Sequence, residues 1–188
     1  MRTRFPLSAL SAGAAVLALA AAPAAVAAVG TGLKGPSTTT SPYVLPIADG
    51  VEVTSLLTVG DLPAGNGYRM VGIPDGLGAR RAPTAAGKLE LFMNQELTSG
   101  VGIVRAHGQK GAFVSDYTID RASLAVNSGQ DLMGPGDISY WNYPTGTYGA
   151  TPSAASPVGS NPLFLAQLAA FGRFCSGTLS DPGQLYNP

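Results

Sequence analysis

Residues 88–93 read Lys-Leu-Glu-Leu-Phe-Met, and their alternation places Leu89, Leu91 and Met93 on one face of an extended chain. Apolar residues at every second position are typical of a β-strand with one buried face. The stretch therefore predicts a strand that packs on a core.

Four further stretches have the composition of short strands, with β-branched or aromatic residues between turn formers. They are residues 51–59, 68–72, 112–119 and 124–127. Phe113, Tyr117 and Ile119 share one face of the third of these stretches. Residues 73–76 (Ile-Pro-Asp-Gly) and 120–123 (Asp-Arg-Ala-Ser) are predicted turns. Because no helical pattern alternates with the strands, we expect a mainly β fold built as an antiparallel meander, as in sandwiches, barrels and propeller blades.

Composition excludes several classes of protein. The 25 Gly and 15 Pro among 188 residues are too many for a coiled coil or a helical bundle. The chain carries 11 basic and 11 acidic side chains, and without a basic excess nucleic acid is not an expected partner. A single Cys excludes a disulfide scaffold and a Cys-rich zinc module.

Residues 1–28 have the pattern of a secretory signal peptide. Arg2 and Arg4 precede an apolar run over 7–22, and Ala-Val-Ala at 25–27 has the form of a signal-peptidase site. A permanent membrane anchor is the alternative, but the cleavage site and Pro23 favour removal. We therefore expect a protein exported by the Sec route, extracellular or periplasmic, without a stable membrane anchor.

The rest of the chain has the length of one domain and divides by composition into four parts. We expect a flexible segment at 29–48, a β-meander at 49–133, a loop rich in Gly, Pro and aromatic residues at 134–160, and a short helix with a tail at 161–188. The aromatic part of the loop, residues 140–148, is either a contact surface or part of a mobile insertion.

The helix is predicted from its capping residues and its apolar spacing. Asn161 can cap it, Pro162 suits its first position, and Gly172 ends it. Four apolar residues are spaced to form one face: Phe164, Leu165, Leu168 and Phe171.

An ordered set of short motifs resembles the N-terminal part of the PhoX-type secreted alkaline phosphatases and their uncharacterised secreted relatives. The motifs are VGIPDGLG at 71–78, MNQEL at 93–97, RAHG at 105–108, GAFVS at 111–115 and SGQDL at 128–132. Further on, RFCS at 173–176 resembles a family segment that precedes a Gly-Glu-Glu motif. The order and the spacing of the motifs also resemble those of the family.

The resemblance implies a large β-propeller phosphatase that uses iron and calcium and hydrolyses phosphate esters. The family usually has His where this chain has Gln95, and its Gly-Glu-Glu segment would fall beyond residue 188. Propellers have four or more blades of roughly 40–45 residues each. We therefore expect an incomplete, propeller-like N-terminal portion whose partner is the remaining C-terminal half.

Metal-assisted hydrolysis of a phosphate ester needs hard oxygen ligands for the cation. Glu96, at the end of a predicted strand beside Asn94, and Asp75, in the Pro-Asp-Gly turn, are candidate ligands. The alternatives are a solvated strand-end carboxylate for Glu96 and a turn-stabilising role for Asp75. The resemblance makes Cys175 a candidate iron ligand, and a small buried hydrophobic residue is its alternative role.

Arg105 and His107 are the candidate catalytic residues. Two positions apart, they can share one face of an extended segment and contact a phosphate. A structural or solvated role for the single His in a Gly-rich loop is the alternative.

Three functional hypotheses remain open. The chain is the N-terminal portion of a secreted metal-dependent phosphatase-like protein and inactive alone, or it is a non-catalytic secreted binding or scaffold domain. The third hypothesis is a diverged enzyme that assembles its site between protomers.

Overall fold

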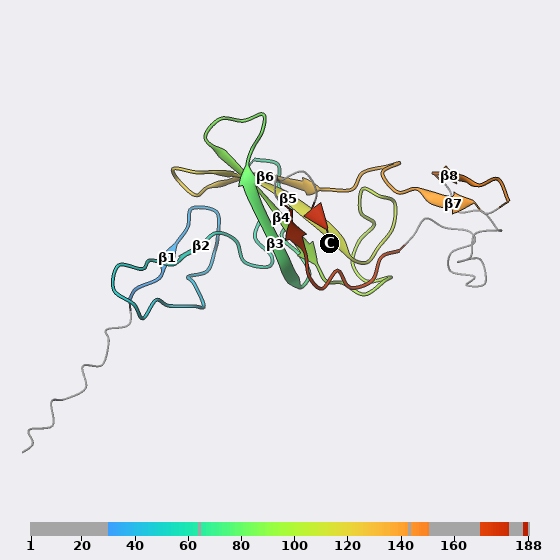
Figure 1. The fold of residues 1–188 in the computed structure, drawn as a ribbon. Coiled ribbons are helices and arrows are strands. Elements are labelled where there is room, and N and C mark those ends of the chain that lie inside the picture. Colours follow the sequence, from blue (N-terminus) through green and yellow to red (C-terminus); the bar gives the residue numbers. More distant parts are fainter. Residues whose placement is uncertain (1–29, 64, 143, 151–169, 181–185, 188) are drawn as a thin grey trace, which may run out of the picture.

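The computed structural model describes residues 30–63, 65–142, 144–150, 170–180 and 186–187 (Figure 1). Every regular element among them is a strand, so the described part is mainly β, as predicted. The described strands do not close into a barrel or a propeller. No helix in these ranges is long and apolar enough to cross a membrane. The predicted signal peptide lies outside them.

The centre of the molecule is a four-stranded antiparallel sheet of β3 (Pro74–Arg81), β4 (Lys88–Gln95), β5 (Phe113–Asp120) and β6 (Val126–Asp131). The strands lie in the order of the sequence, which confirms the predicted meander (Figure 1). Compared with the predictions, β4 extends two residues beyond Met93 and β6 begins two residues later than expected.

One face of this sheet forms the hydrophobic core. In the register of β4 and β5, Leu89 lies opposite Ile119 and Leu91 opposite Tyr117. The predicted apolar face of residues 88–93 is therefore confirmed. The core cluster consists of Met70, Met93, Tyr117, Ile119 and Val126, with Leu56, Leu57, Tyr68, Leu89 and Leu91 packed against it.

Three predictions for the N-terminal half were wrong. Residues 73–76 are not only a turn, because β3 begins at Pro74 and pairs with β4. The register of this pairing shifts between Pro74 and Leu77. Only β2 (Thr54–Ser55) forms within residues 51–59, and it pairs in parallel with β1 (Leu33–Lys34). Residues 68–72 form no strand, since the backbone N–H and C=O of Met70 bond to the loop at residues 60–61 instead of a sheet.

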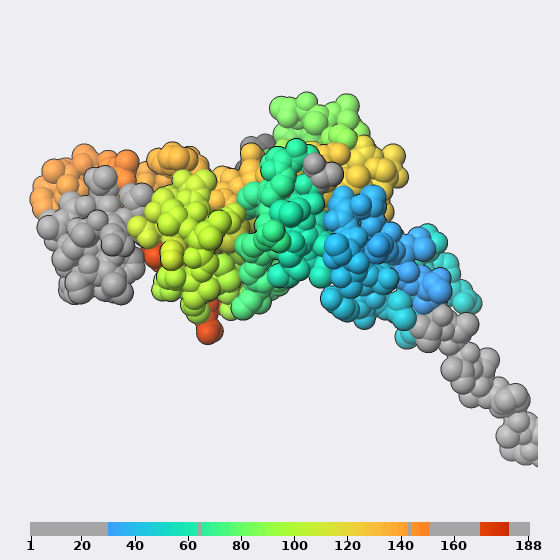
Figure 2. Space-filling view, turned by 180° about the vertical axis from the view of Figure 1, so that it is seen from behind, coloured from blue at the N-terminus to red at the C-terminus, as the bar shows by residue number. Residues whose placement is uncertain are grey.

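The segment predicted as a loop contains a hairpin of β7 (Tyr140–Asn142) and β8 (Thr147–Gly149). Figures 1 and 2 place this hairpin and the N-terminal segment at opposite ends of the central sheet. The predicted C-terminal helix falls mostly on residues outside the described ranges. Its described end, residues 170–172, is not helical, and β9 (Thr178–Leu179) follows and pairs with β10 (Tyr186–Asn187).

Candidate functional sites

A buried ion pair joins the loop between β4 and β5 to the end of β6. Arg105 Nε donates to Asp131 Oδ2 at 3.2 Å, and Arg105 Nη2 donates to Asp131 Oδ1. Each side chain is only 8 % exposed. The guanidinium also lies over the Phe113 ring, 3.8 Å from its centroid. Arg105 is thus held by a carboxylate and a ring, and not presented to an external phosphate.

Tyr68 extends this pair into a network. Its hydroxyl donates to Asp131 Oδ1 at 2.6 Å, accepts from Arg105 Nη2 at 2.8 Å and lies 3.1 Å from Ser115 Oγ. Burial, together with the hydrogen bond to Asp131, raises the pKa of Tyr68, so the phenol stays protonated. Gln95 Nε2 donates to Ser115 Oγ at 3.2 Å and ties β4 to the same group.

Asp131 remains ionised in this environment. Burial acts to raise its pKa, but hydrogen bonds from Arg105, Tyr68 and the backbone N–H of Ala106 together hold the pKa below its usual value. Neither Asp131 nor Tyr68 is among the candidate residues predicted from the sequence. A single sequence does not show that two residues so far apart are in contact. The one available signal is general: an Arg that is buried needs a carboxylate partner.

His107 lies beside the network but is not part of it. The residue is 3 % exposed, and neither ring nitrogen has a hydrogen-bond partner. Burial lowers its pKa, the charge of Asp131 acts in the opposite direction, and that of Arg105 adds to the lowering. The imidazole is therefore neutral near pH 7, and its ring packs 5.3 Å from that of Phe171. The expected pairing of Arg105 and His107 on one phosphate is not seen in this arrangement.

Two of the three candidate metal ligands, Glu96 and Cys175, are in contact at one corner of the sheet. The thiol of Cys175 donates to Glu96 Oε1 at 3.1 Å, although the two residues are 79 positions apart. This hydrogen bond is the main cause of a raised pKa for the thiol, followed by desolvation and by the charges of Glu96 and Asp75. Asp75 therefore lies close enough to act electrostatically on Cys175.

The backbone brings these segments together. Glu96 N–H donates to Ile73 C=O at 2.8 Å, and Arg173 N–H donates to Leu97 C=O at 2.9 Å. Gly76 approaches the segment after Cys175 so closely that a Cβ at this position would lie 2.0 Å from the backbone nitrogen of Gly177. The start of β3, the end of β4 and the 173–177 segment thus form one corner, which we call the Glu96–Cys175 corner.

The donor set of this corner fits a transition-metal ion better than calcium. Calcium prefers six to eight oxygen ligands, whereas thiolate selects softer ions. In the part of the chain that the structure describes, no group of three or more His, Cys, Asp or Glu side chains is arranged to hold a metal ion. The corner thus offers two adjacent donors, Glu96 and Cys175.

Comparison of the chain with protein-family models, with curated proteins and with solved structures finds no match in any of them. Functional inference therefore depends on the geometry of these residues and on the motifs in the sequence.

Proposed function

We propose that this chain supplies part of the metal-binding centre of a secreted, metal-dependent phosphatase-like protein. The observation that carries the proposal is the 3.1 Å separation of Cys175 Sγ and Glu96 Oε1. A thiol and a carboxylate held this close become two anionic ligands once the thiol loses its proton to a competing cation. Asp75 adds a third negative charge at the same corner.

Iron fits Cys175 and Glu96, and calcium fits only the carboxylates of Glu96 and Asp75. A metal ion at this position supplies Lewis-acid polarisation of a phosphoryl oxygen. The chain's own residues hold the ligands in place: Leu97 fixes the 173–177 segment through its backbone, and Gly76 permits the close contact with that segment.

We further propose that the chain works as one portion of a larger propeller-like protein and does not hydrolyse phosphate esters alone. Two or three donor atoms leave most coordination positions of a catalytic metal ion without a protein ligand. Exposed apolar side chains also lie just before β3, at Ile73, and within it, at Leu77, and a second structural unit would cover them. The four-stranded meander has the topology of one propeller blade.

A metal titration of the full chain tests the proposal. Cobalt(II), used as a spectroscopic substitute for iron(II), is expected to produce a thiolate-to-metal charge-transfer band, because Cys175 is the only cysteine. The band should vanish in Cys175→Ser and weaken in Glu96→Gln and Asp75→Asn. The exposed carboxylate of Glu52 gives the matched control, Glu52→Gln. A band unaffected by Glu96→Gln would contradict the shared site.

Turnover tests the second part of the proposal. With iron and calcium added, the full chain is expected to leave an aryl phosphate such as 4-nitrophenyl phosphate unhydrolysed. Hydrolysis that Glu96→Gln abolishes would show that the chain is a complete enzyme.

A non-catalytic binding domain is the second candidate function. The rings of Trp141 and Tyr148 pack edge to face across the β7–β8 hairpin, with centroids 5.0 Å apart. Tyr148 is 70 % exposed, so the hairpin presents an aromatic surface as in many contact sites. Absence of the cobalt band would favour this function over the first.

A further inference from the structure

The buried imidazole of His107 has two unsatisfied hydrogen-bonding atoms, Nδ1 and Nε2. A neutral imidazole offers one donor and one acceptor, and leaving such a group unpaired costs on the order of 1–3 kcal/mol per atom. Folded proteins rarely retain an unpaired buried polar side chain without a functional reason. His107 therefore indicates a place where a bound molecule completes the hydrogen bonding.

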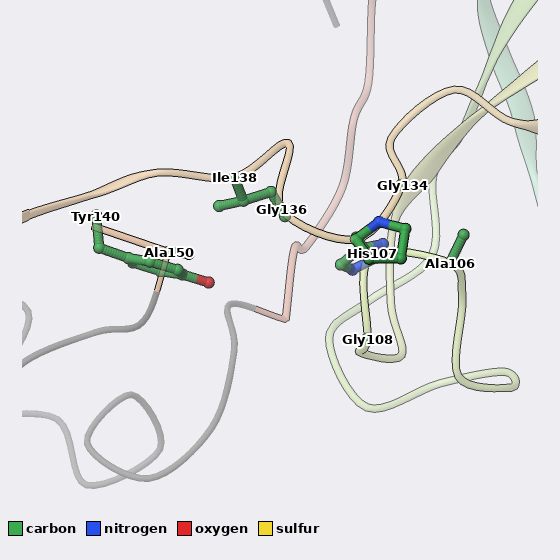
Figure 3. Close-up of a pocket in the computed structure, with 9 residues that line it drawn as sticks. Ala106, His107, Gly108, Gly134, Gly136, Ile138, Tyr140 and Ala150 are labelled. Carbon is green, nitrogen blue, oxygen red and sulfur yellow. The ribbon is translucent and has the colours of Figure 1, made fainter. Parts of the chain in front are cut away.

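His107 lines a cavity of about 360 Å³ between its own loop and the base of the β7–β8 hairpin. This volume is at the small end of the range of roughly 300–1,000 Å³ for small-molecule sites. In Figure 3 the His107 ring lies at one end of the pocket and Tyr140 at the other, with the hydroxyl of Tyr140 turned toward the His107 side. The lining residues are Ala106, His107, Gly108, Gly134, Pro135, Gly136, Ile138, Tyr140 and Ala150.

The lining contains no Lys, Arg, Asp or Glu. Arg105, whose charge acts on His107, is paired with Asp131, so nothing in the lining compensates the charge of an anionic ligand. A fully ionised phosphate ester offers only acceptors to a neutral imidazole, and one nitrogen would stay unpaired. A metal cation finds one nitrogen ligand and no carboxylate among the lining residues. A purely apolar ligand would leave both nitrogens unpaired.

We propose that this pocket binds a neutral, polyhydroxylated ligand, a single saccharide unit, whose hydroxyl groups hydrogen-bond the imidazole of His107. A hydroxyl donates and accepts, so it can pair with either nitrogen in either tautomer. The aromatic ring of Tyr140 and the side chain of Ile138 supply apolar surface for the C–H face of the sugar. Three of the lining residues are glycines, so no side chain at those positions fills the pocket beside the imidazole.

The proposal goes beyond both functions above, because the pocket requires neither a metal at the Glu96–Cys175 corner nor the exposed rings of Trp141 and Tyr148. The chain itself supplies two unambiguous reporters. His107 is the only histidine and Trp141, next to Tyr140, is the only tryptophan. Their NMR and fluorescence signals therefore belong to one residue each.

The experiment titrates the full chain with D-glucose, D-galactose, D-mannose and N-acetyl-D-glucosamine, each to high millimolar concentration. We expect at least one of them to shift the imidazole ¹⁵N and ¹H resonances of His107 and to change Trp141 emission, both saturably and with the same midpoint. Inorganic phosphate and Zn²⁺ are the comparison probes. A saturable response to either of them and to no sugar would overturn the proposal, and so would the absence of any response.

Two neighbouring substitutions separate binding from folding. Ala150→Leu adds bulk at the exposed rim of the pocket without touching the imidazole, and it should abolish the saturable response. Gly149→Ala is the matched control, since a Cβ at this position meets nothing within 4 Å and Gly149 does not line the pocket. An unchanged midpoint in Ala150→Leu would show that the sugar binds elsewhere and would contradict the site.

Discussion

The guanidinium of Arg105 binds the carboxylate of Asp131 through two nitrogens, at the point where β6 ends and the loop before β5 crosses it. The pair is buried, and Tyr68 and the backbone N–H of Ala106 satisfy the remaining carboxylate lone pairs. Because the loop that follows Arg105 carries His107, this contact positions one wall of the His107 pocket. Arg105 is therefore a positioning residue in this structure.

Loss of the Asp131 charge should destabilise the protein strongly. In Asp131→Asn the buried guanidinium of Arg105 keeps its charge without a counterion, which typically costs about 3–5 kcal/mol. The measurement is urea denaturation of the full chain, read from the midpoint at constant slope. The exposed Glu52→Gln should change stability by no more than about 0.5 kcal/mol. Equal stability of Asp131→Asn and Glu52→Gln would mean that the pair is not buried in solution.

The same pair predicts how stability depends on acid. The pKa of Asp131 is lower in the folded protein than in the unfolded chain, where an Asp titrates near 3.9. Its contribution is therefore complete above about pH 4 and is lost as the pH falls through the folded-state pKa. Melting temperatures between pH 6 and pH 2 should fall less steeply in Asp131→Asn than in the natural chain. If the melting temperatures of the two proteins fall equally steeply with pH, the pKa of Asp131 is not lowered by folding.

His107→Leu should leave stability unchanged or raise it. The substitution keeps a buried side chain beside Phe171 and removes two polar atoms that have no partner. Replacing an unsatisfied polar group by an apolar one of similar size is commonly neutral or stabilising. Thermal melting at pH 7.5 measures the effect, and a loss of more than about 1 kcal/mol would show that the imidazole is hydrogen-bonded within the protein.

The pH dependence of that variant gives a second, independent outcome. The folded-state pKa of His107 lies below its unfolded value near 6.5, so the unfolded chain binds the extra proton first as the pH falls. The natural chain should therefore lose stability between pH 7 and pH 5, and His107→Leu should lose less. A natural chain that is flat over this range would contradict the lowered pKa.

Local pattern was enough to predict the sheet but not its edges. The period of two at Leu89, Leu91 and Met93 specified a buried face, and the predicted meander followed from tight turns. Strand β3 was missed because Pro74 and Gly76 are turn formers by propensity, whereas pairing with β4 decides their conformation. Residues 51–59 have strand composition but lack a neighbouring strand over most of their length.

For the candidate sites too, the sequence predicted individual residues but not all the contacts between them. Glu96, Asp75 and Cys175 were predicted as ligands, and the fold brings Glu96 and Cys175 into contact across 79 positions of sequence. Arg105 and His107 were predicted to act together, but Asp131 takes the guanidinium and leaves the imidazole alone. Such partners come from distant strands, and a single sequence carries no signal for contacts between them.

Gly76→Ala should open the Glu96–Cys175 corner without changing a ligand. The new Cβ would lie 2.0 Å from the backbone nitrogen of Gly177, so the 173–177 segment must move away from β3. Cys175 then loses its hydrogen bond to Glu96, which is the main cause of its raised pKa. A thiol of ordinary pKa is more ionised near pH 8, and we expect faster reaction with an aromatic disulfide reagent than in the natural chain.

Two variants give this expectation its controls. Glu96→Gln replaces the charged acceptor by a neutral amide and should accelerate the thiol reaction in the same direction, because the negative charge that favours the protonated thiol is lost. Gly149→Ala, whose added Cβ meets no atom within 4 Å, should leave the rate unchanged. If Glu96→Gln accelerates the reaction and Gly76→Ala does not, the 173–177 segment tolerates a side chain at residue 76. The contact between Cys175 and Glu96 would then not depend on close packing of β3, because the backbone bond from Arg173 to Leu97 would hold the corner together without it.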